Sequence, residues 1–192
     1  MSLQVVLLGT AGLAVGSITA GTIERMAPAW HPTGLPLWLA AFWAIAAGVG
    51  TGGVSLVLTW WCACLASIDI GSRRLPNVFT AVGAVGVLVY AWAVGNAGCS
   101  IAGAVLLFSC YLVVHLWSPR AFGAGDVKLA FMLGGVAGLA GAHAWVTAAL
   151  LAPLLTGFVG VVASVLGRGR TTIAHGPAMC VSTLLAVAGV PT

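Results

Sequence analysis

Charge is what this sequence has least of. Of its 192 residues only 5% are Asp, Glu, Lys or Arg, while 61% are hydrophobic. A soluble domain carries about 25% charged residues, because its core must be covered by a polar surface. So few charges exclude a soluble globular protein of this length. The composition predicts an integral membrane protein, and its abundant Gly and Ala are typical of helices that pack closely in lipid.

Metal-binding patterns are also absent. The five cysteines include no C-x-x-C pair, which excludes a zinc ribbon, and we interpret them as apolar packing residues. The four histidines, His31, His115, His143 and His175, show no ligand spacing. We therefore expect no metal and no other cofactor. The net charge of +4 is spread over several loops without interleaved exposed aromatics, which indicates contact with membrane lipids and excludes nucleic acid.

Hydrophobic runs, divided by charges, prolines and glycine clusters, predict the helices. The predicted ranges are 3–21, 36–50, 53–68, 78–94, 99–117, 127–141, 144–166 and 173–190. The first range lacks a basic region before it, so we expect a retained membrane helix there and not a signal peptide. No linker divides the chain. The sequence predicts an all-α polytopic bundle of about eight transmembrane helices in one integral-membrane domain, residues 1–192, and gives no oligomeric state.

The basic residues fall on one side of this bundle. With eight spans, the loops 22–35, 69–77, 118–126 and 167–172 share a side, and the seven Lys and Arg residues lie in them or beside them. They are Arg25, Arg73, Arg74, Arg120, Lys128, Arg168 and Arg170. The positive-inside rule places these loops in the cytoplasm and both termini outside.

Only three residues are acidic, and all lie on the predicted cytoplasmic side: Glu24, Asp69 and Asp126. Asp69 ends the third predicted helix in CLASIDIGSRRLPN, and Asp126 begins the sixth in FGAGDVK. Two modest roles stay open, a surface ion pair of Asp69 with Arg73 and a helix N-cap at Asp126. Up-and-down packing can also bring the two aspartates together at one depth.

Such a pair has a defined chemistry. Two carboxylates held close cannot both ionise cheaply, so one keeps a proton. The ionised carboxylate then takes a proton from water while the other polarises a peptide carbonyl, with no metal and no covalent intermediate. Gly123 and Gly125 beside Asp126 would let an extended peptide approach, although glycines also serve simply as caps and turns.

These segments resemble the type IV prepilin peptidases, which are membrane aspartyl proteases of the GxGD class. Asp69 with Arg74-Leu75-Pro76-Asn77 resembles the first catalytic block of that family. Gly123-Ala124-Gly125-Asp126-Val127-Lys128 resembles the second block, GxGDxK. His175-Gly176-Pro177-Ala178 resembles the Gly-Pro segment of the last helix, and parts of residues 16–25 resemble the end of the first helix in longer members.

The resemblance implies an aspartic endopeptidase with Asp69 and Asp126 as its catalytic pair. Its substrate would be a prepilin or pseudopilin precursor, whose short basic leader it removes. The enzyme would be a multi-pass protein of the bacterial cytoplasmic (inner) membrane, with its active site facing the cytoplasm. Residues expected to bind substrate or shape the site are Pro76, Asn77, Gly123, Gly125, Lys128, Gly176 and Pro177. For Lys128 a snorkelling interfacial lysine is the alternative.

One departure from the family is clear. Longer members carry a cytoplasmic insert with two C-x-x-C pairs after the first helix, and they also N-methylate the new N-terminus. Here that place holds only residues Ala27–Pro36. We therefore expect peptidase activity without methyltransferase activity.

Other functions remain open at this point. The chain could be a non-enzymatic membrane subunit of a pilus or secretion assembly, or an ion- or proton-coupled transporter. Against a transporter, both aspartates lie at one face and no inverted repeat of broken helices is evident. The presenilin-like branch of GxGD proteases pairs its motif with Tyr-Asp, whereas Ile68 precedes Asp69 here.

Overall fold

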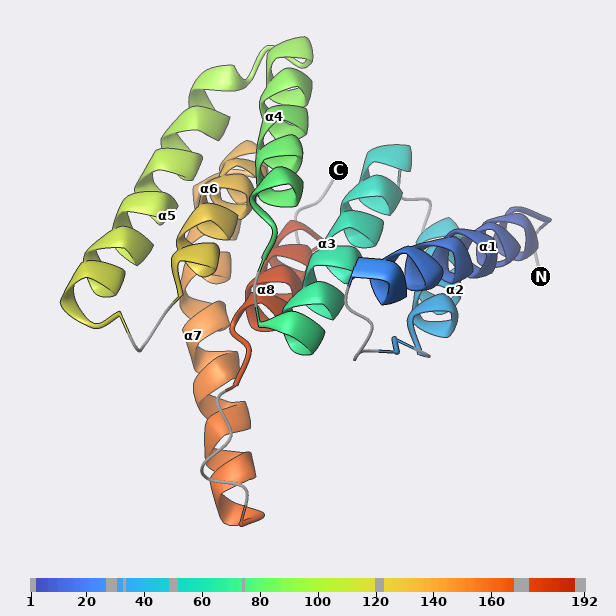
Figure 1. Cartoon of the computed structure of the whole chain (residues 1–192). Helices are drawn as coiled ribbons and strands as arrows, with labels where there is room; N and C mark the ends of the chain where they lie inside the picture. The colour runs from blue at the N-terminus through green and yellow to red at the C-terminus, as the bar shows by residue number, and fades with distance from the viewer. Residues whose placement is uncertain are drawn as a thin grey trace. The chain divides into compact units, whose positions relative to one another are not determined.

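The computed structural model describes residues 3–26, 31–32, 34–48, 52–73, 75–119, 123–167 and 173–188. Within these ranges the regular structure consists of eight helices, coloured from blue to red in Figure 1. They are α1 (Leu3–Met26), α2 (Leu35–Gly48), α3 (Gly53–Ser72), α4 (Asn77–Ala93), α5 (Ala97–Trp117), α6 (Ala124–Leu139), α7 (Ala142–Val165) and α8 (Gly176–Ala188). The prediction of an all-helical fold with eight helices is confirmed, and residues 36–68 do form two helices.

Two helices end later than the sequence predicted, α6 begins at Ala124 where the prediction began at 127, and α8 is shorter than the predicted range 173–190. α1 continues past 21 to Met26, and α3 continues past 68 to Ser72. In α1 the Thr22 hydroxyl bonds to the Ile18 carbonyl, so a polar residue stays inside the helix by satisfying its hydroxyl locally. The extension of α3 places Asp69 inside the last turn of the helix.

Four of the described helices are long and apolar enough to cross a membrane. These candidate spans are Leu3–Arg25, Gly53–Ser72, Ala97–Trp117 and Ala142–Val165. Shorter apolar helices accompany them at Leu35–Ala44, Asn77–Ala93 and Gly176–Ala188. Together with the scarcity of charge, they make this protein a helical membrane bundle.

The chain forms two compact units. Unit 1 is Met1–Arg73 and contains α1 to α3; unit 2 is Arg74–Thr192 and contains α4 to α8. The single peptidase domain expected over residues 1–192 stays a prediction.

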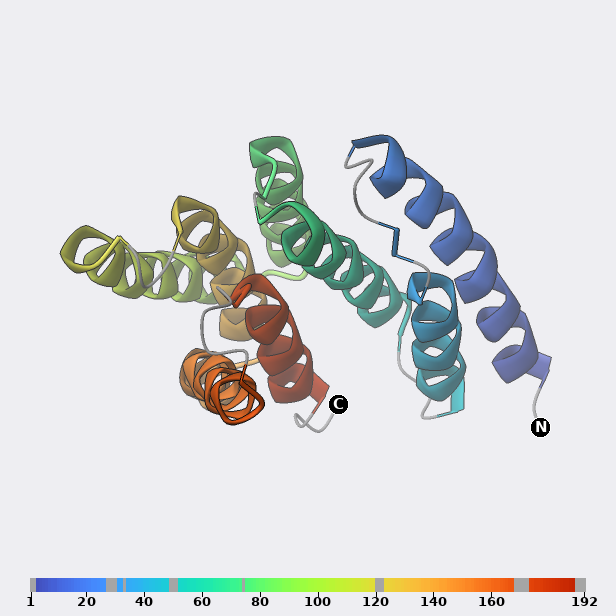
Figure 2. The same cartoon turned by 60° about the horizontal axis from the view of Figure 1, so that its bottom comes forward.

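In unit 1, α1 and α2 run antiparallel in close contact (Figure 2). Gly12 and Gly16, four positions apart, lie on the face of α1 that meets α2. A Cβ atom added to Gly16 would lie 2.5 Å from the Cα atom of Pro36. Only glycine permits this approach of two backbones, which gains van der Waals contact in lipid, where little hydrophobic effect drives helices together.

A small apolar cluster joins the three helices of unit 1. Its buried members are Ile23, Leu35, Leu39 and Ile68. The Trp60 ring also donates a hydrogen bond of 3.0 Å from Nε1 to the Thr19 hydroxyl, which connects α3 to α1. The end of α3 that carries Asp69 is therefore fixed within unit 1.

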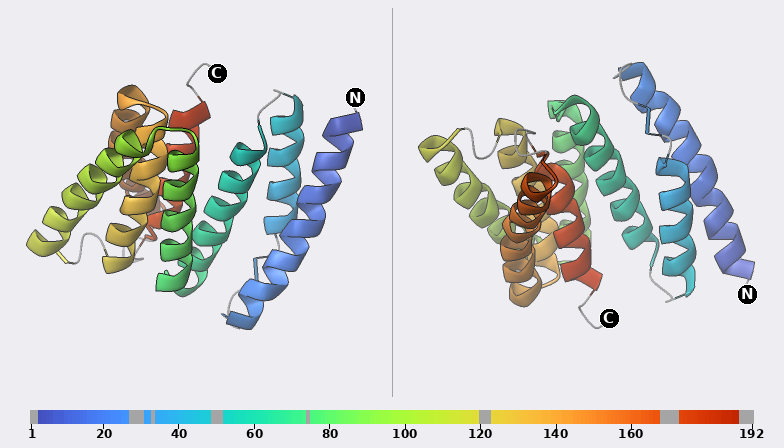
Figure 3. Two further views of the ribbon diagram at one scale, coloured as in Figure 1. Left: turned by 90° about the horizontal axis from the view of Figure 1, so that it is seen from above. Right: turned by 90° about the horizontal axis from the view of Figure 1, so that it is seen from below.

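In unit 2, α6 is the central helix and contacts α4, α5, α7 and α8, as the two views of Figure 3 show. Most of its residues are buried, so it differs from the lipid-facing helices around it. Its contact with α5 depends on three glycines. A Cβ atom on Gly134 would lie 2.5 Å from the Gly103 carbonyl oxygen, and one on Gly138 would lie 2.5 Å from that of Cys99.

Candidate active site

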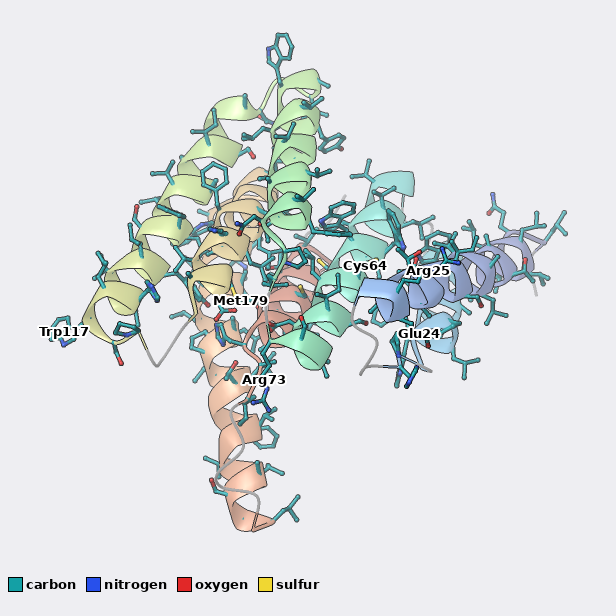
Figure 4. The ribbon with its side chains drawn as sticks, viewed as in Figure 1. Glu24, Arg25, Cys64, Arg73, Trp117 and Met179 are labelled. Carbon is teal, nitrogen blue, oxygen red and sulfur yellow. The ribbon has the colours of Figure 1, made fainter. Side chains whose placement is uncertain are left out.

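Asp69 lies in the last turn of α3 and is buried, with 7% of its surface exposed. The helix ends at Arg73, labelled in Figure 4, which adopts a left-handed conformation with φ 51° and ψ 27°. Its backbone N–H donates to the Asp69 carbonyl over 2.9 Å. This is an αL cap, and a non-glycine residue there is uncommon. The cap fixes the backbone of Asp69 at the point where the helix stops.

Asp126 is the third residue of α6. The N-cap is Gly123, with φ −74° and ψ 159°. The alternative in which Asp126 is itself the N-cap is therefore wrong. The Asp126 carboxylate instead reaches back and accepts the Gly123 backbone N–H over 2.9 Å. This arrangement is half of a capping box. The partial positive charge of the helix N-terminus favours the ionised carboxylate.

Two of the sequence motifs meet within unit 2. Lys128 Nζ donates a hydrogen bond of 2.7 Å to Asn77 Oδ1, which joins α6 to the first residue of α4. A Cβ atom on Gly125 would lie 3.4 Å from that of Leu75. Pro76 is the N-cap of α4, and its carbonyl accepts the first helical hydrogen bonds. The Leu-Pro-Asn segment therefore packs against the GxGDxK segment.

This contact carries a prediction. Replacing Lys128 by Met, which keeps the length of the side chain, removes the hydrogen bond, as does Asn77→Ala. A hydrogen bond to a charged group contributes about 1.5 kcal/mol, so each change is expected to slow peptide cleavage at this site roughly tenfold. The double variant should be no slower than either single variant, because one interaction is lost in each case. If the factors by which the single changes slow the reaction multiply in the double variant, the two residues act separately.

The Gly-Pro segment begins α8. Gly176 is the first residue of the helix and Pro177 the second, where proline costs no hydrogen bond. The preceding residue, His175, is buried, and its carbonyl accepts the Met179 N–H over 3.1 Å. Its ring contacts Tyr111 of α5 and Thr156 of α7.

Sequence patterns did not point to Tyr111 or Thr156, and His175 was noted only as the residue before Gly176 and Pro177. His175 lacks ligand spacing, and the two hydroxyl residues stand singly in apolar helices. What could have drawn attention to them is polarity: a buried hydroxyl or imidazole in a lipid-embedded helix needs a partner. Their mutual contact spans 64 positions along the chain, from Tyr111 to His175, which sequence spacing does not reveal.

Burial lowers the pKa of His175 from its usual 6.5 to about 4. In the unfolded chain the imidazole of His175 becomes protonated as the pH falls through 6.5. In the folded chain it becomes protonated only near pH 4. Stability from this residue is complete above pH 6.5 and is lost as the pH falls from 6.5 towards 4.

Because of this residue, the free energy of unfolding is expected to be about 2 kcal/mol lower at pH 5 than at pH 7. Thermal unfolding of the full chain in detergent micelles at the two pH values measures it. In His175→Gln, which cannot titrate, the difference should shrink by that amount. An unchanged pH dependence in this variant would contradict the assignment.

Not every predicted residue can be placed. Arg74 of the first motif, Phe122 before the second, and the loop residues Arg120, Arg168 and Arg170 lie outside the described residues. Among the described residues, no group of three or more His, Cys, Asp or Glu side chains is positioned to hold a metal ion.

The site residues can now be compared with known proteins. A family model described as the type IV leader peptidase family matches residues 56–165, more than half of the chain. The chain belongs to the type IV leader peptidase family. Neither a curated protein nor a solved structure matches it. Membership confirms the resemblance that the motifs indicate, and it makes this protein a leader-peptidase-like membrane protease.

The family match covers parts of both units. It begins in α3 of unit 1 and ends at the last residue of α7 in unit 2. Both aspartates, Asn77 and Lys128 lie inside it, whereas His175, Gly176 and Pro177 lie beyond it. The match therefore includes residues of both units.

Proposed function

We propose that this protein is an aspartyl endopeptidase that removes the short basic leader from prepilin or pseudopilin precursors. Asp69 and Asp126 would form its catalytic pair. The observation that carries the proposal is the leader-peptidase match, which contains both aspartates of the chain. The third acid, Glu24, lies outside the match, in the last turn of α1 (Figure 4).

The two carboxylates have environments suited to a shared proton. Asp126 accepts a backbone N–H at a helix N-terminus, and Asp69 is buried at the end of an apolar helix. One ionised carboxylate would deprotonate water, while the protonated one would donate a hydrogen bond to the scissile carbonyl. The roles then reverse, and a proton passes to the departing amine. The protonation state belongs to the pair and not to either residue.

Several neighbouring residues would shape the site for an extended peptide. Gly123 and Gly125 lie beside Asp126 and bring no side chain of their own between it and a substrate backbone. The Lys128–Asn77 hydrogen bond would hold the Pro76 segment against them. Gly176 and Pro177 would act at the start of α8. No cofactor takes part in this scheme, and methyltransferase activity is not proposed.

We place the catalytic face in the cytoplasm of a bacterial inner membrane. All basic residues fall on the predicted cytoplasmic side, including Arg25 at the end of α1 and Arg73 at the end of α3 (Figure 4). In this topology the precursor meets the enzyme before its mature part leaves the membrane.

Cysteine labelling tests this orientation. Asn96→Cys, in the turn before α5, should react with an impermeant maleimide added outside intact cells. Ser118→Cys, just after α5, should react only once the membrane is permeabilised. Both changes belong in a background in which the exposed cysteines, Cys99 and Cys110, are replaced by Ala. The opposite labelling pattern would place the catalytic face outside.

The function is tested by co-expression. The full chain is produced with a leader-bearing prepilin in a host lacking its own leader peptidase, and both products are identified by mass. We expect leader loss at one peptide bond. An intact precursor, with the chain present at normal abundance in the membrane, would favour a non-enzymatic assembly subunit or a transporter.

A further inference from the structure

A buried chain of hydrogen bonds crosses unit 2 beside the proposed site. Tyr111 Oη on α5 lies 2.8 Å from Nε2 of His175, and Thr156 Oγ1 on α7 lies 2.6 Å from Nδ1 of the same ring. Tyr111 is 6% exposed and His175 4% exposed. One imidazole therefore connects two helices to the first turn of a third, α8.

The direction of each hydrogen bond can be assigned. The Thr156 hydroxyl donates its only proton to the Ala152 carbonyl, 3.1 Å away. We assign the hydroxyl as the acceptor towards His175, so that Nδ1 carries the proton of the ring. Nε2 is then left as an acceptor, and the Tyr111 hydroxyl donates to it. All three groups are satisfied when the imidazole is neutral and protonated on Nδ1.

This chain of bonds reaches two parts of the proposed site. Tyr111 lies on α5, which packs along α6, the helix whose first turn carries Asp126. His175 directly precedes Gly176 and Pro177, and its carbonyl begins the hydrogen bonding of α8. A change at the imidazole can therefore alter both the surroundings of Asp126 and the position of the Gly-Pro turn.

We propose that His175 is a positioning residue of the peptidase. As the neutral Nδ1–H tautomer it holds the Tyr111 hydroxyl in a fixed orientation on α5, and it ties the start of α8 to α7 through Thr156. His175 acts through Tyr111 and touches no substrate itself. The inference rests on the proposed function.

The tautomer can be observed without any substrate. The full chain is labelled with 15N-histidine in detergent micelles, and the signals of His175 are identified by their loss in His175→Gln. At pH 7 we expect the coupling pattern of a neutral ring protonated on Nδ1. A ring protonated on Nε2, or an averaged pattern, would overturn the hydrogen-bond assignment and with it the proposal.

The positioning role is measured in the cleavage reaction. Tyr111→Phe removes the hydroxyl alone. His175→Leu removes the imidazole and with it the hydrogen bonds to Tyr111 and Thr156. Tyr111→Phe is expected to lower kcat about tenfold with KM nearly unchanged, the effect of one hydrogen bond, and His175→Leu at least as much. His175→Gln, which can offer Tyr111 an acceptor near the place of Nε2, should recover much of the rate lost in His175→Leu.

The chain supplies matched controls. Tyr90→Phe removes the hydroxyl of the other tyrosine, which is exposed on α4. Thr147→Val removes a hydroxyl of α7 that bonds only its own helix, at the His143 carbonyl. Both controls should cleave at the wild-type rate. Melting temperatures of all variants separate lost positioning from lost folding.

The outcomes separate the two proposals. If wild type cleaves the precursor while Tyr111→Phe and His175→Leu match it, the positioning role is wrong and the proposed function stands. If wild type leaves the precursor intact, the proposed function fails and the positioning role fails with it.

Discussion

Asp69→Asn and Asp126→Asn are each expected to lower leader removal by a factor of about 10² to 10⁴, the usual contribution of positioned acid–base groups. Asparagine keeps the size of the side chain but can neither take a proton from water nor return one to the amine. The rate is measured with purified full chain in micelles and a precursor peptide, alongside a check that each variant folds.

The double variant carries the sharper prediction. Because the two carboxylates share one task, replacing both should cost little more than replacing one. Glu24→Gln removes the third acid of the chain and should leave the rate unchanged, since Glu24 lies outside the family match and is paired with His31 at 3.4 Å. If one single Asn variant keeps a near wild-type rate, that aspartate is a cap or an anchor and the paired mechanism is wrong.

Gly134→Ala is expected to destabilise unit 2 by about 1 to 3 kcal/mol, the usual cost of overpacking a tight contact. The new Cβ atom would lie 2.5 Å from the Gly103 carbonyl oxygen and 2.7 Å from the Leu107 Cβ atom. Backbone does not yield as a flexible side chain does, so α5 and α6 must separate. Since α6 carries Asp126, activity should fall together with the melting temperature.

Gly86→Ala is the matched control for this prediction. Gly86 also lies within a helix, α4, but a Cβ atom added there meets nothing within 4 Å. Alanine is the better helix former by about 1 kcal/mol, so this variant should be as stable as wild type or more stable. Equal melting temperatures for the two variants would show that the glycine contact between α5 and α6 is not tight in the membrane.

Much of the fold could be predicted from the sequence because lipid imposes a simple rule. Every backbone group in a span must be satisfied within it, so an apolar run of sufficient length becomes a helix. Helix ends were harder to predict. Asp69 and Asp126 are polar residues near helix termini, and polarity does not say whether such a residue lies inside the last turn or just beyond it.

The candidate site could also be predicted only in part. Its motifs were recognisable because each combines a rare acid with Gly, Pro or Asn at a fixed spacing. The Lys128–Asn77 bond was not predictable, since it joins residues 51 positions apart. The glycines of α6 were inconspicuous among 27 in the chain, although their close approach to α5 fixes the helix that carries Asp126.

Whether Asp69 and Asp126 lie side by side, as the proposed catalytic pair requires, can be measured by cross-linking. Asp69→Cys and Asp126→Cys are combined in a chain whose exposed Cys99 and Cys110 are replaced by Ala, and a protease site is inserted at the turn Val94–Asn96. The parent chain, with both aspartates present, must still remove the leader.

The double-cysteine chain is treated with a short bifunctional thiol reagent and then with the protease. We expect its two halves, which carry positions 69 and 126, to stay joined by the cross-link. They should separate in each single-cysteine control, because the remaining native cysteines, Cys62, Cys64 and Cys180, are buried. Halves that separate although both new thiols react with a monofunctional reagent would contradict the catalytic pair.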